Sequence, residues 1–242
     1  MNDALDSHLK AYERQSIYDF DNFLALRWYP QRVIDRAPGA TSLLELGLGH
    51  GISTDIFNRH FRRHVVLDGS SAVIENFSKL YPDSHPEVIN TYFEDFTTEE
   101  RFDVIVLGYV LEHVDDPVRI LSRYKPLLSP GAKMFVAVPN AEALNRRLGH
   151  IAGMLPEMTA LSEHDLLLGH KRYYTIDTLR DDIVEAGYEL VAMEGIYLKA
   201  ITTQQALSLN FDDRILDALC QVAIDYPELS CGLLAEVTPF ER

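Results

Sequence analysis

The segment SLLELGLGHG, residues 42–51, decides the fold, because an apolar run ends there in a loop that contains three glycines. The run 42–46 is typical of a buried strand, and Gly47, Gly49 and Gly51 follow it directly. Glycine lets the chain turn sharply and lets backbone amides approach a ligand, where a β-carbon would obstruct them. A helix that starts near Gly51 adds the positive end of its dipole. The segment therefore predicts a strand, a ligand-binding loop and a helix, with a tight turn that binds nothing as the alternative.

An acidic residue follows one strand later, because Asp68 ends the next apolar run, 23 residues after Glu45. A carboxylate in this place can accept hydrogen bonds from both hydroxyls of a ribose, although a helix N-cap shared with Ser70 is the alternative. Dinucleotide enzymes use the spacing GxGxxG, whereas this loop is GxGxG and is preceded by Glu45, which would repel a pyrophosphate. S-adenosylmethionine, which carries a ribose, an ammonium and a carboxylate, therefore fits these residues better than NAD.

Strand-like runs alternate with amphipathic stretches along the chain, the pattern of an α/β fold with a parallel sheet covered by helices. Five consecutive strands, a sixth and a seventh are predicted over 42–46, 64–67, 88–91, 104–107, 134–138, 188–198 and 232–237. Asp116 followed by Pro117 predicts a helix start, Gly187 a helix end, and residues 214–226 a further helix. We expect a Rossmann-like, doubly wound sheet.

The regular alternation is interrupted twice, which suggests covers for a substrate. We expect a helical N-terminal cap over residues 1–40 and one α/β domain over 41–242, with insertions at 139–174 and 199–230. The N-terminal segment is aromatic, with Tyr12, Tyr18, Phe20, Phe23, Trp28 and Tyr29, and the 139–174 insertion carries His150, His164 and His170. In an open α/β sheet such loops overhang the carboxyl ends of the strands, where ligands bind. Packing of these segments onto the sheet is the alternative.

The composition excludes several classes of protein. A formal net charge of −15 argues against binding to nucleic acid, which needs a concentrated basic face, and is explained as well by solubility. The two cysteines, Cys220 and Cys231, form no CxxC pair and are compatible with a reducing cytoplasm. The sequence shows neither a signal peptide nor an apolar run of 18 residues, so we expect a cytoplasmic protein that acts without a membrane.

Several motifs in order along residues 25–195 resemble those of class I S-adenosylmethionine-dependent methyltransferases, in particular the ubiquinone-biosynthesis type of small-molecule O-methyltransferase. The motifs are Leu44 to Gly51, Asp68, Phe102 to Val106, Leu111 to Val114 with Asp116 and Pro117, Val138 to Asn140, and Gly169 to Arg172. The resemblance implies a seven-stranded sheet whose last strand is antiparallel. It also implies S-adenosyl-L-methionine as the co-substrate.

The resemblance assigns cofactor contacts to individual residues. The methionyl moiety is expected against Gly47 and Gly49, the ribose at Asp68, and the adenine beside Phe93 and Glu94, with Asp95 as the alternative acid. Arg27 lies 18 residues before Glu45, where quinone-type enzymes carry an arginine that clamps the cofactor carboxylate, and Arg32 is the alternative. The complete expected cofactor-binding set is Arg27, Glu45, Leu46, Gly47, Gly49, Asp68, Gly69, Phe93, Glu94, Gly108 and Tyr109.

Methyl transfer mainly requires alignment of the acceptor with the methyl group, and a general base is optional. His113 follows the fourth strand at its carboxyl edge and is the leading candidate for a base, with His170 and then His164 behind it. A histidine that only orders the loop at Glu112 is the alternative. We expect no metal, because the sequence shows no cluster of carboxylates and asparagine, and Asp115 with Asp116 is explained by helix capping.

The predicted function is methyl transfer to a small molecule, with a hydroxyl or carboxyl oxygen ahead of an amine as the acceptor. An NAD-linked oxidoreductase and a non-catalytic S-adenosylmethionine-binding regulator are the alternatives. We expect a monomer or a homodimer.

Overall fold

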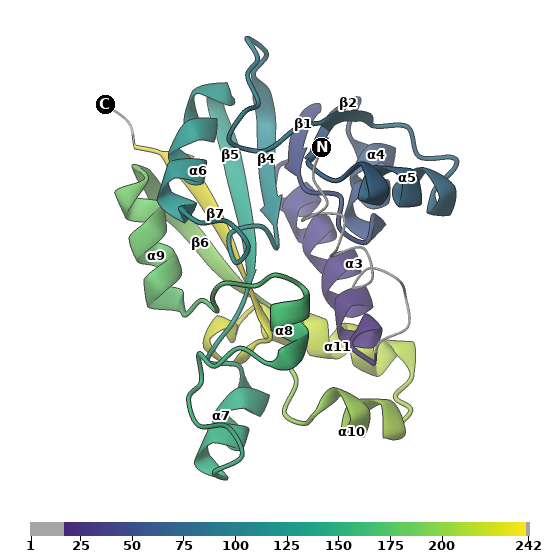
Figure 1. The fold of residues 1–242 in the computed structure, drawn as a ribbon, viewed down its shortest axis with the longest axis vertical. Coiled ribbons are helices and arrows are strands. Elements are labelled where there is room, and N and C mark those ends of the chain that lie inside the picture. The colour runs from purple at the N-terminus through teal and green to yellow at the C-terminus, as the bar shows by residue number, and fades with distance from the viewer. Residues whose placement is uncertain (1–16, 241–242) are drawn as a thin grey trace.

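A computed structural model describes residues 17–240 of the chain (Figure 1). Its centre is a seven-stranded sheet in the order β3-β2-β1-β4-β5-β7-β6. The strands are β1 (Ser42–Leu46), β2 (Arg63–Asp68), β3 (Glu87–Asn90), β4 (Phe102–Gly108), β5 (Leu128–Pro139), β6 (Tyr188–Ile196) and β7 (Gly232–Pro239). The first five strands run parallel to one another, and β7 runs antiparallel to both β5 and β6. The predicted Rossmann-like sheet with an antiparallel last strand is confirmed.

Side chains alternate across the sheet and divide the core into two layers. In β1, Leu44 and Leu46 pack against one set of helices, whereas Leu43 faces the opposite side. The first layer holds α6 (Pro117–Tyr124) and α9 (Ile176–Glu185), and the second holds α3 (Asp19–Arg36), α4 (Ile52–His60) and α11 (Asp213–Ala223). On that second side α5 (Ser71–Leu80) packs on Val66 of β2. Because helices cover both faces, the sheet is doubly wound, as predicted.

The helix boundaries follow the local signals in the sequence. Asp116 caps α6 through a bond from the backbone N–H of Arg119 to its Oδ1 atom, at 2.9 Å, and Pro117 occupies the first turn. After α9, Gly187 adopts a left-handed conformation with φ of 82°, which is favourable for glycine at a helix end. The helix predicted over 214–226 is observed as α11, which ends at Ala223, and a short 3₁₀ helix follows at Pro227–Leu229.

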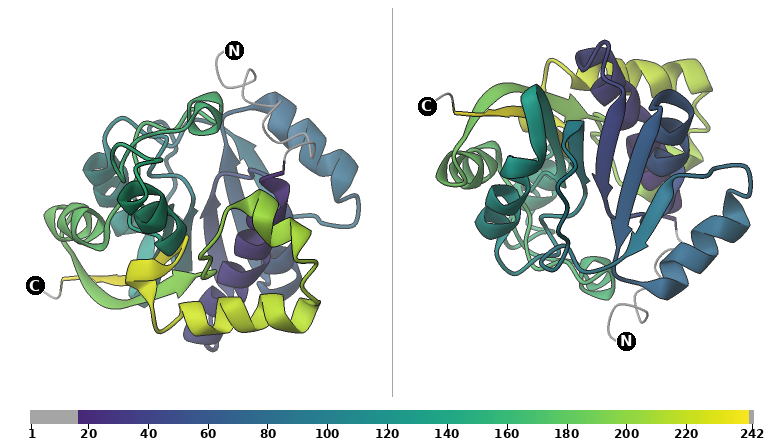
Figure 2. Two further views of the ribbon diagram at one scale, coloured as in Figure 1. Left: turned by 90° about the horizontal axis from the view of Figure 1, so that it is seen from below. Right: turned by 90° about the horizontal axis from the view of Figure 1, so that it is seen from above.

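The helices in the segments that interrupt the regular strand–helix alternation lie at one end of the sheet, where the parallel strands end (Figure 1). The segment after β5 forms α7 (Leu144–Ile151) and α8 (Glu163–Leu167), and the segment after β6 forms α10 (Thr203–Ser208) and then α11. Both α10 and α11 contact α3, as the view from below in Figure 2 shows. These elements therefore surround the carboxyl ends of the strands.

The N-terminal cap is described only from residue 17, so Tyr12 lies outside the described residues. Within the part of the chain that is described, no helix has the length and apolarity that crossing a bilayer requires.

Candidate active site

A cavity of about 880 Å³ opens at the carboxyl ends of the parallel strands. Its wall includes the loops after β1, β2, β3, β4 and β5, residues of α3, α7, α8 and α10, and the segments that follow α8 and β6. Clefts in this position of an open α/β sheet are the usual place for ligands. The cavity thus joins the glycine loop to the two segments that the sequence suggested as covers.

The glycine loop adopts backbone conformations that explain its composition. Gly47, Gly49 and Gly51 have φ values of 84°, 48° and 75°, a region that side chains with a β-carbon rarely adopt. The backbone N–H of Gly47 donates to Leu67 O at 2.8 Å, which ties the loop to the end of β2. Gly47 and Gly49 both line the cavity, and Gly51 caps α4. The loop therefore presents backbone to the cavity.

Asp68 lies at the end of β2 and lines the cavity beside Gly69. Its Oδ2 atom accepts a hydrogen bond from the N–H of Leu48 at 2.9 Å, and its Oδ1 atom accepts one from the N–H of Ser70 at 2.8 Å. A carboxylate can accept about four hydrogen bonds, so these two are compatible with further bonds from a ribose. Asp68 thus joins the glycine loop to the start of α5 and faces the ligand space.

Phe93, Glu94, Gly108 and Tyr109 also line the cavity, as expected for cofactor-binding positions, whereas Asp95 does not. A β-carbon on Gly47 would lie 3.9 Å from Cζ of Phe93, so the ring of Phe93 faces the glycine loop. Tyr109 has a φ of 59°, an uncommon backbone conformation for a residue with a side chain. Strained residues of this kind are concentrated at functional sites.

The structure does not bring Glu45 and Leu46 to the cavity. In β1 the side chain of Glu45 points to the face covered by α3 and α4, and it is 1% exposed. Its carboxylate accepts from Oγ of Ser53 at 3.1 Å and lies 3.0 Å from Nε2 of His64. Leu46 belongs to the core on the opposite face. Both side chains pack in the core next to the glycine loop and on opposite faces of the sheet, because successive residues of a strand point to opposite sides.

Arg27 likewise lies outside the cavity wall. Its guanidinium binds Asp217 of α11 at 2.5 Å and lies 5.3 Å from the ring centre of Phe23. The alternative, Arg32, binds Glu194 and Asp35. In this structure both guanidinium groups are therefore engaged by carboxylates of the protein.

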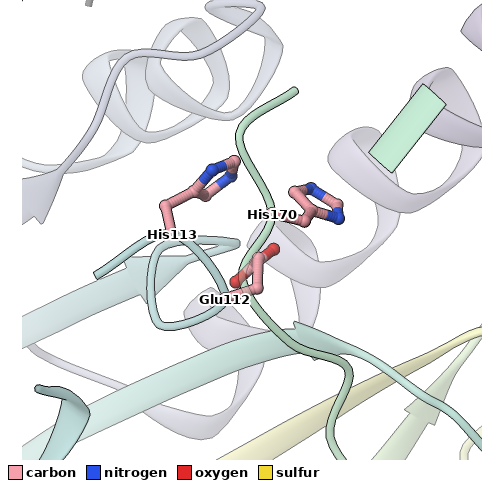
Figure 3. A group of neighbouring side chains, drawn as sticks. All are labelled: Glu112, His113 and His170. Atoms are coloured by element: carbon pink, nitrogen blue, oxygen red, sulfur yellow. The ribbon is translucent and has the colours of Figure 1, made fainter. Parts of the chain in front are cut away.

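Two loops bring His113 and His170 together over the buried Glu112 (Figure 3). The imidazole rings are 4.7 Å apart between centroids and lie edge to face. Glu112 is completely buried, and burial raises the pKa of its carboxyl group to about 7. Both histidines and Glu112 line the cavity. The predicted pair of histidines thus shares one wall, and the sequence did not single out Glu112 as a member of the site.

Asp165 stands behind His170, with 3.3 Å between its Oδ1 atom and Nδ1 of the histidine. It also accepts hydrogen bonds from Oγ of Ser162 at 2.6 Å and from the hydroxyl of Tyr173 at 3.1 Å. Burial opposes ionisation of Asp165, but the contact with His170 and the bonds from Ser162 prevail and lower its pKa. Asp165 is therefore an anion that faces the back of His170.

The cavity wall contains a second group of polar side chains, which was not predicted from the sequence. Lys199 is 8% exposed, binds the carboxylate of Asp21 and donates to Oγ1 of Thr203 at 2.9 Å. All three residues line the cavity. They come from α3, from the segment after β6 and from α10, so no spacing in the sequence connects them.

Comparison with known proteins decides the class of enzyme. The family model described as "Methyltransferase domain" matches residues 18–193, which is most of the chain. The chain belongs to this methyltransferase family. The prediction of a class I S-adenosylmethionine-dependent methyltransferase is confirmed, and the NAD-linked alternative is not favoured.

Curated relatives of this methyltransferase share the name of one enzyme type. The chain is 30% identical over 180 residues to a ubiquinone biosynthesis O-methyltransferase of Parvibaculum lavamentivorans, covering 70% of this chain and 67% of the relative. It is 24% identical over 206 residues to the enzyme of the same name from Acinetobacter baylyi, covering 79% and 80%. The branch expected from the motifs is confirmed.

Solved structures show the same fold. The N-methyltransferase NodS from Bradyrhizobium japonicum superposes with a TM-score of 0.63 at 16% identity, over 99% of this chain and 100% of NodS. The plantazolicin methyltransferase BpumL gives a TM-score of 0.61 at 16% identity, over 97% and 89%. At these identities the likeness concerns the fold alone.

Proposed function

We propose that this methyltransferase binds S-adenosylmethionine between the glycine loop and Phe93 and transfers its methyl group to a small-molecule acceptor beside His113 and His170. The single observation that carries this proposal is that one cavity contains the loop, Asp68 and both histidines. Glycine backbone in left-handed conformations fits the close approach of an amino-acid ligand. Asp68 fits a ribose, and Glu94 rather than Asp95 is the acid available to an adenine.

The reaction is an in-line displacement. A bond forms between the acceptor atom and the methyl carbon while the bond from that carbon to the sulfonium breaks, so that the sulfur leaves with the electron pair as a neutral thioether. The proton of the acceptor passes to a base or to solvent. Alignment of the two reactants supplies most of the rate enhancement that a protein can give to such a step.

We propose a hydroxyl or carboxyl oxygen as the acceptor, ahead of an amine. The names of the curated O-methyltransferase relatives support oxygen, whereas a structural neighbour, NodS, is an N-methyltransferase. His113 and His170 are the groups that we assign to loss of the acceptor proton, because imidazole titrates near neutral pH. The remaining wall, with Lys199, Asp21 and Thr203, is where we expect the rest of the acceptor to bind.

The cofactor assignment is tested by Asp68→Ala. We expect calorimetry to show that the demethylated product, S-adenosylhomocysteine, binds the wild type, and that the variant loses about 1 to 3 kcal/mol of binding free energy, the usual cost of unpaired polar groups. Asp83→Ala, an exposed aspartate outside the cavity, is the control and should bind like the wild type. Unchanged affinity in Asp68→Ala would exclude the ribose contact, and no binding to the wild type would exclude the proposed cofactor site.

A further inference from the structure

Glu112, His113 and His170 are placed as ligands of a single ion would be. One oxygen of Glu112 and one ring nitrogen of each histidine all lie within 4.8 Å of one another (Figure 3). We infer that these three side chains form a binding site for one divalent transition-metal ion in the wall of the active-site cavity. From the sequence we expected no metal, because it shows no cluster of carboxylates and asparagine. His170 lies more than fifty positions from the other two residues, so the group forms only in the folded chain.

The environment of Glu112 points independently to a cation. The residue is fully buried, and among the described residues neither Oε1 nor Oε2 has a hydrogen-bond partner. A buried carboxylate is costly unless a positive charge or hydrogen bonds compensate for it. A cation between the carboxylate and the two imidazoles supplies that compensation.

The nature of the donor atoms selects the kind of ion. Imidazole nitrogens favour zinc, iron, cobalt and nickel, whereas magnesium and calcium prefer oxygen ligands. Two histidines and one carboxylate are a familiar ligand set for such ions, and three protein ligands leave coordination positions for another molecule. Because all three residues line the cavity, those positions face the ligand space.

The backbone holds the three residues in place. Glu112 and His113 belong to the loop between β4 and α6, and His170 belongs to the segment after α8. The N–H of Lys171 donates to Glu112 O at 2.8 Å, and the guanidinium of Arg172 donates to Val114 O at 2.8 Å. The two loops are therefore tied together next to the proposed site, by the two residues that follow His170, so that little reorganisation is needed for an ion to bind.

Asp165 gives His170 the support that ligating histidines usually have. Histidine ligands commonly direct one ring nitrogen to a carboxylate and the other to the metal. Nδ1 of His170 lies 3.3 Å from Oδ1 of Asp165, and Ser162 and Tyr173 hold that carboxylate in place. Asp165 is thus a positioning residue for the metal site.

The metal site rests on the proposed function only for the effect that a bound ion would have on the acceptor. A divalent ion in this wall would make a nearby acceptor hydroxyl more acidic, which is the task that we assigned to the histidines. The ion binding itself is independent of which cofactor the glycine loop accepts.

The experiment uses tag-free, chelator-treated full-length protein titrated with Co²⁺, whose visible absorption reports coordination by the protein. We expect saturation at one ion per chain. Glu112→Gln and His170→Ala should each bind Co²⁺ at least about tenfold more weakly, and Asp165→Asn about ten- to a hundredfold more weakly. His164→Ala is the matched control, because it removes a cavity histidine outside the triplet and should bind like the wild type.

Calorimetry with S-adenosylhomocysteine is run on every variant and shows whether the cavity is still folded. Absence of Co²⁺ binding by a wild type that binds S-adenosylhomocysteine would overturn the metal site and leave the proposed function standing. Co²⁺ binding that survives in both Glu112→Gln and His170→Ala, or that is lost equally in His164→Ala, would overturn the assignment of the ligands. A wild type that binds Co²⁺ but not S-adenosylhomocysteine would support the site while excluding the proposed function.

Discussion

His113→Ala is expected to lower turnover by about 10²- to 10⁴-fold, the usual contribution of a group that handles a proton in the rate-limiting step. His113 lines the cavity, and its ring lies 4.7 Å from that of His170, next to the expected position of the acceptor. The affinity for S-adenosylhomocysteine should change little, because the expected cofactor residues lie around the glycine loop and Asp68. Steady-state kinetics with an unmethylated acceptor that the wild type methylates, together with calorimetry, measures both quantities.

The control for this variant is His85→Ala, which removes an exposed histidine outside the cavity and should leave turnover unchanged. Comparable losses of turnover and of cofactor affinity in His113→Ala would contradict the proposed role. In that case His113 would act by holding the loop at Glu112, and His170 would become the leading candidate for the residue at the acceptor.

Gly51→Ala is expected to lower the free energy of unfolding by about 2 to 4 kcal/mol, because a left-handed backbone and a crowded site both oppose a β-carbon. Gly51 has a φ of 75° and caps α4. An added Cβ would lie 2.6 Å from Cδ2 of Phe77 and 2.7 Å from Cε2 of Tyr81, both aromatic rings packed around α5. Because the residue ends the loop that we propose binds the cofactor, affinity for S-adenosylhomocysteine should fall as well. Urea denaturation monitored by circular dichroism, with calorimetry, measures the two effects.

Gly39→Ala is the matched control for the backbone part of this effect. Gly39 has a φ of 82°, but an added Cβ there would meet no atom within 4 Å. We therefore expect a loss of only about 1 kcal/mol, from the backbone conformation alone. If Gly51→Ala is no more destabilised than Gly39→Ala, the contacts with Phe77 and Tyr81 do not constrain the loop.

The strands were predictable because their signal is local. The run 42–46 is the observed β1, and the other predicted strands differ from the observed ones mainly at their ends. The largest extension is in β5, which begins at Leu128 and includes Ser129, Pro130 and Gly131. These three residues favour turns, so the sequence did not predict that Leu128 pairs with Phe102. Pairing with a neighbouring strand outweighs local preference at such ends.

The position of residues in the cavity wall was predictable where the backbone itself forms that wall. Gly47, Gly49, Asp68 and Gly69 line the cavity as expected, since a strand end followed by glycines has few possible conformations. Glu45 shows the limit of this reasoning. Its proximity in sequence to the loop suggested a ligand contact, but strand alternation turns its carboxylate to Ser53 and His64.

By itself, the sequence determined the parallel sheet, the glycine loop and the acid at the end of β2, because hydrophobic periodicity and glycine conformations act over a few residues. Only the tertiary structure decided that His170 meets Glu112 and His113, that Asp165 stands behind it, and that Lys199 binds Asp21. These contacts join segments distant in sequence, and they depend on how the covers pack over the sheet. Burial of Glu112 and the pairing of Lys199 are set by that packing, and no local pattern of residues encodes them.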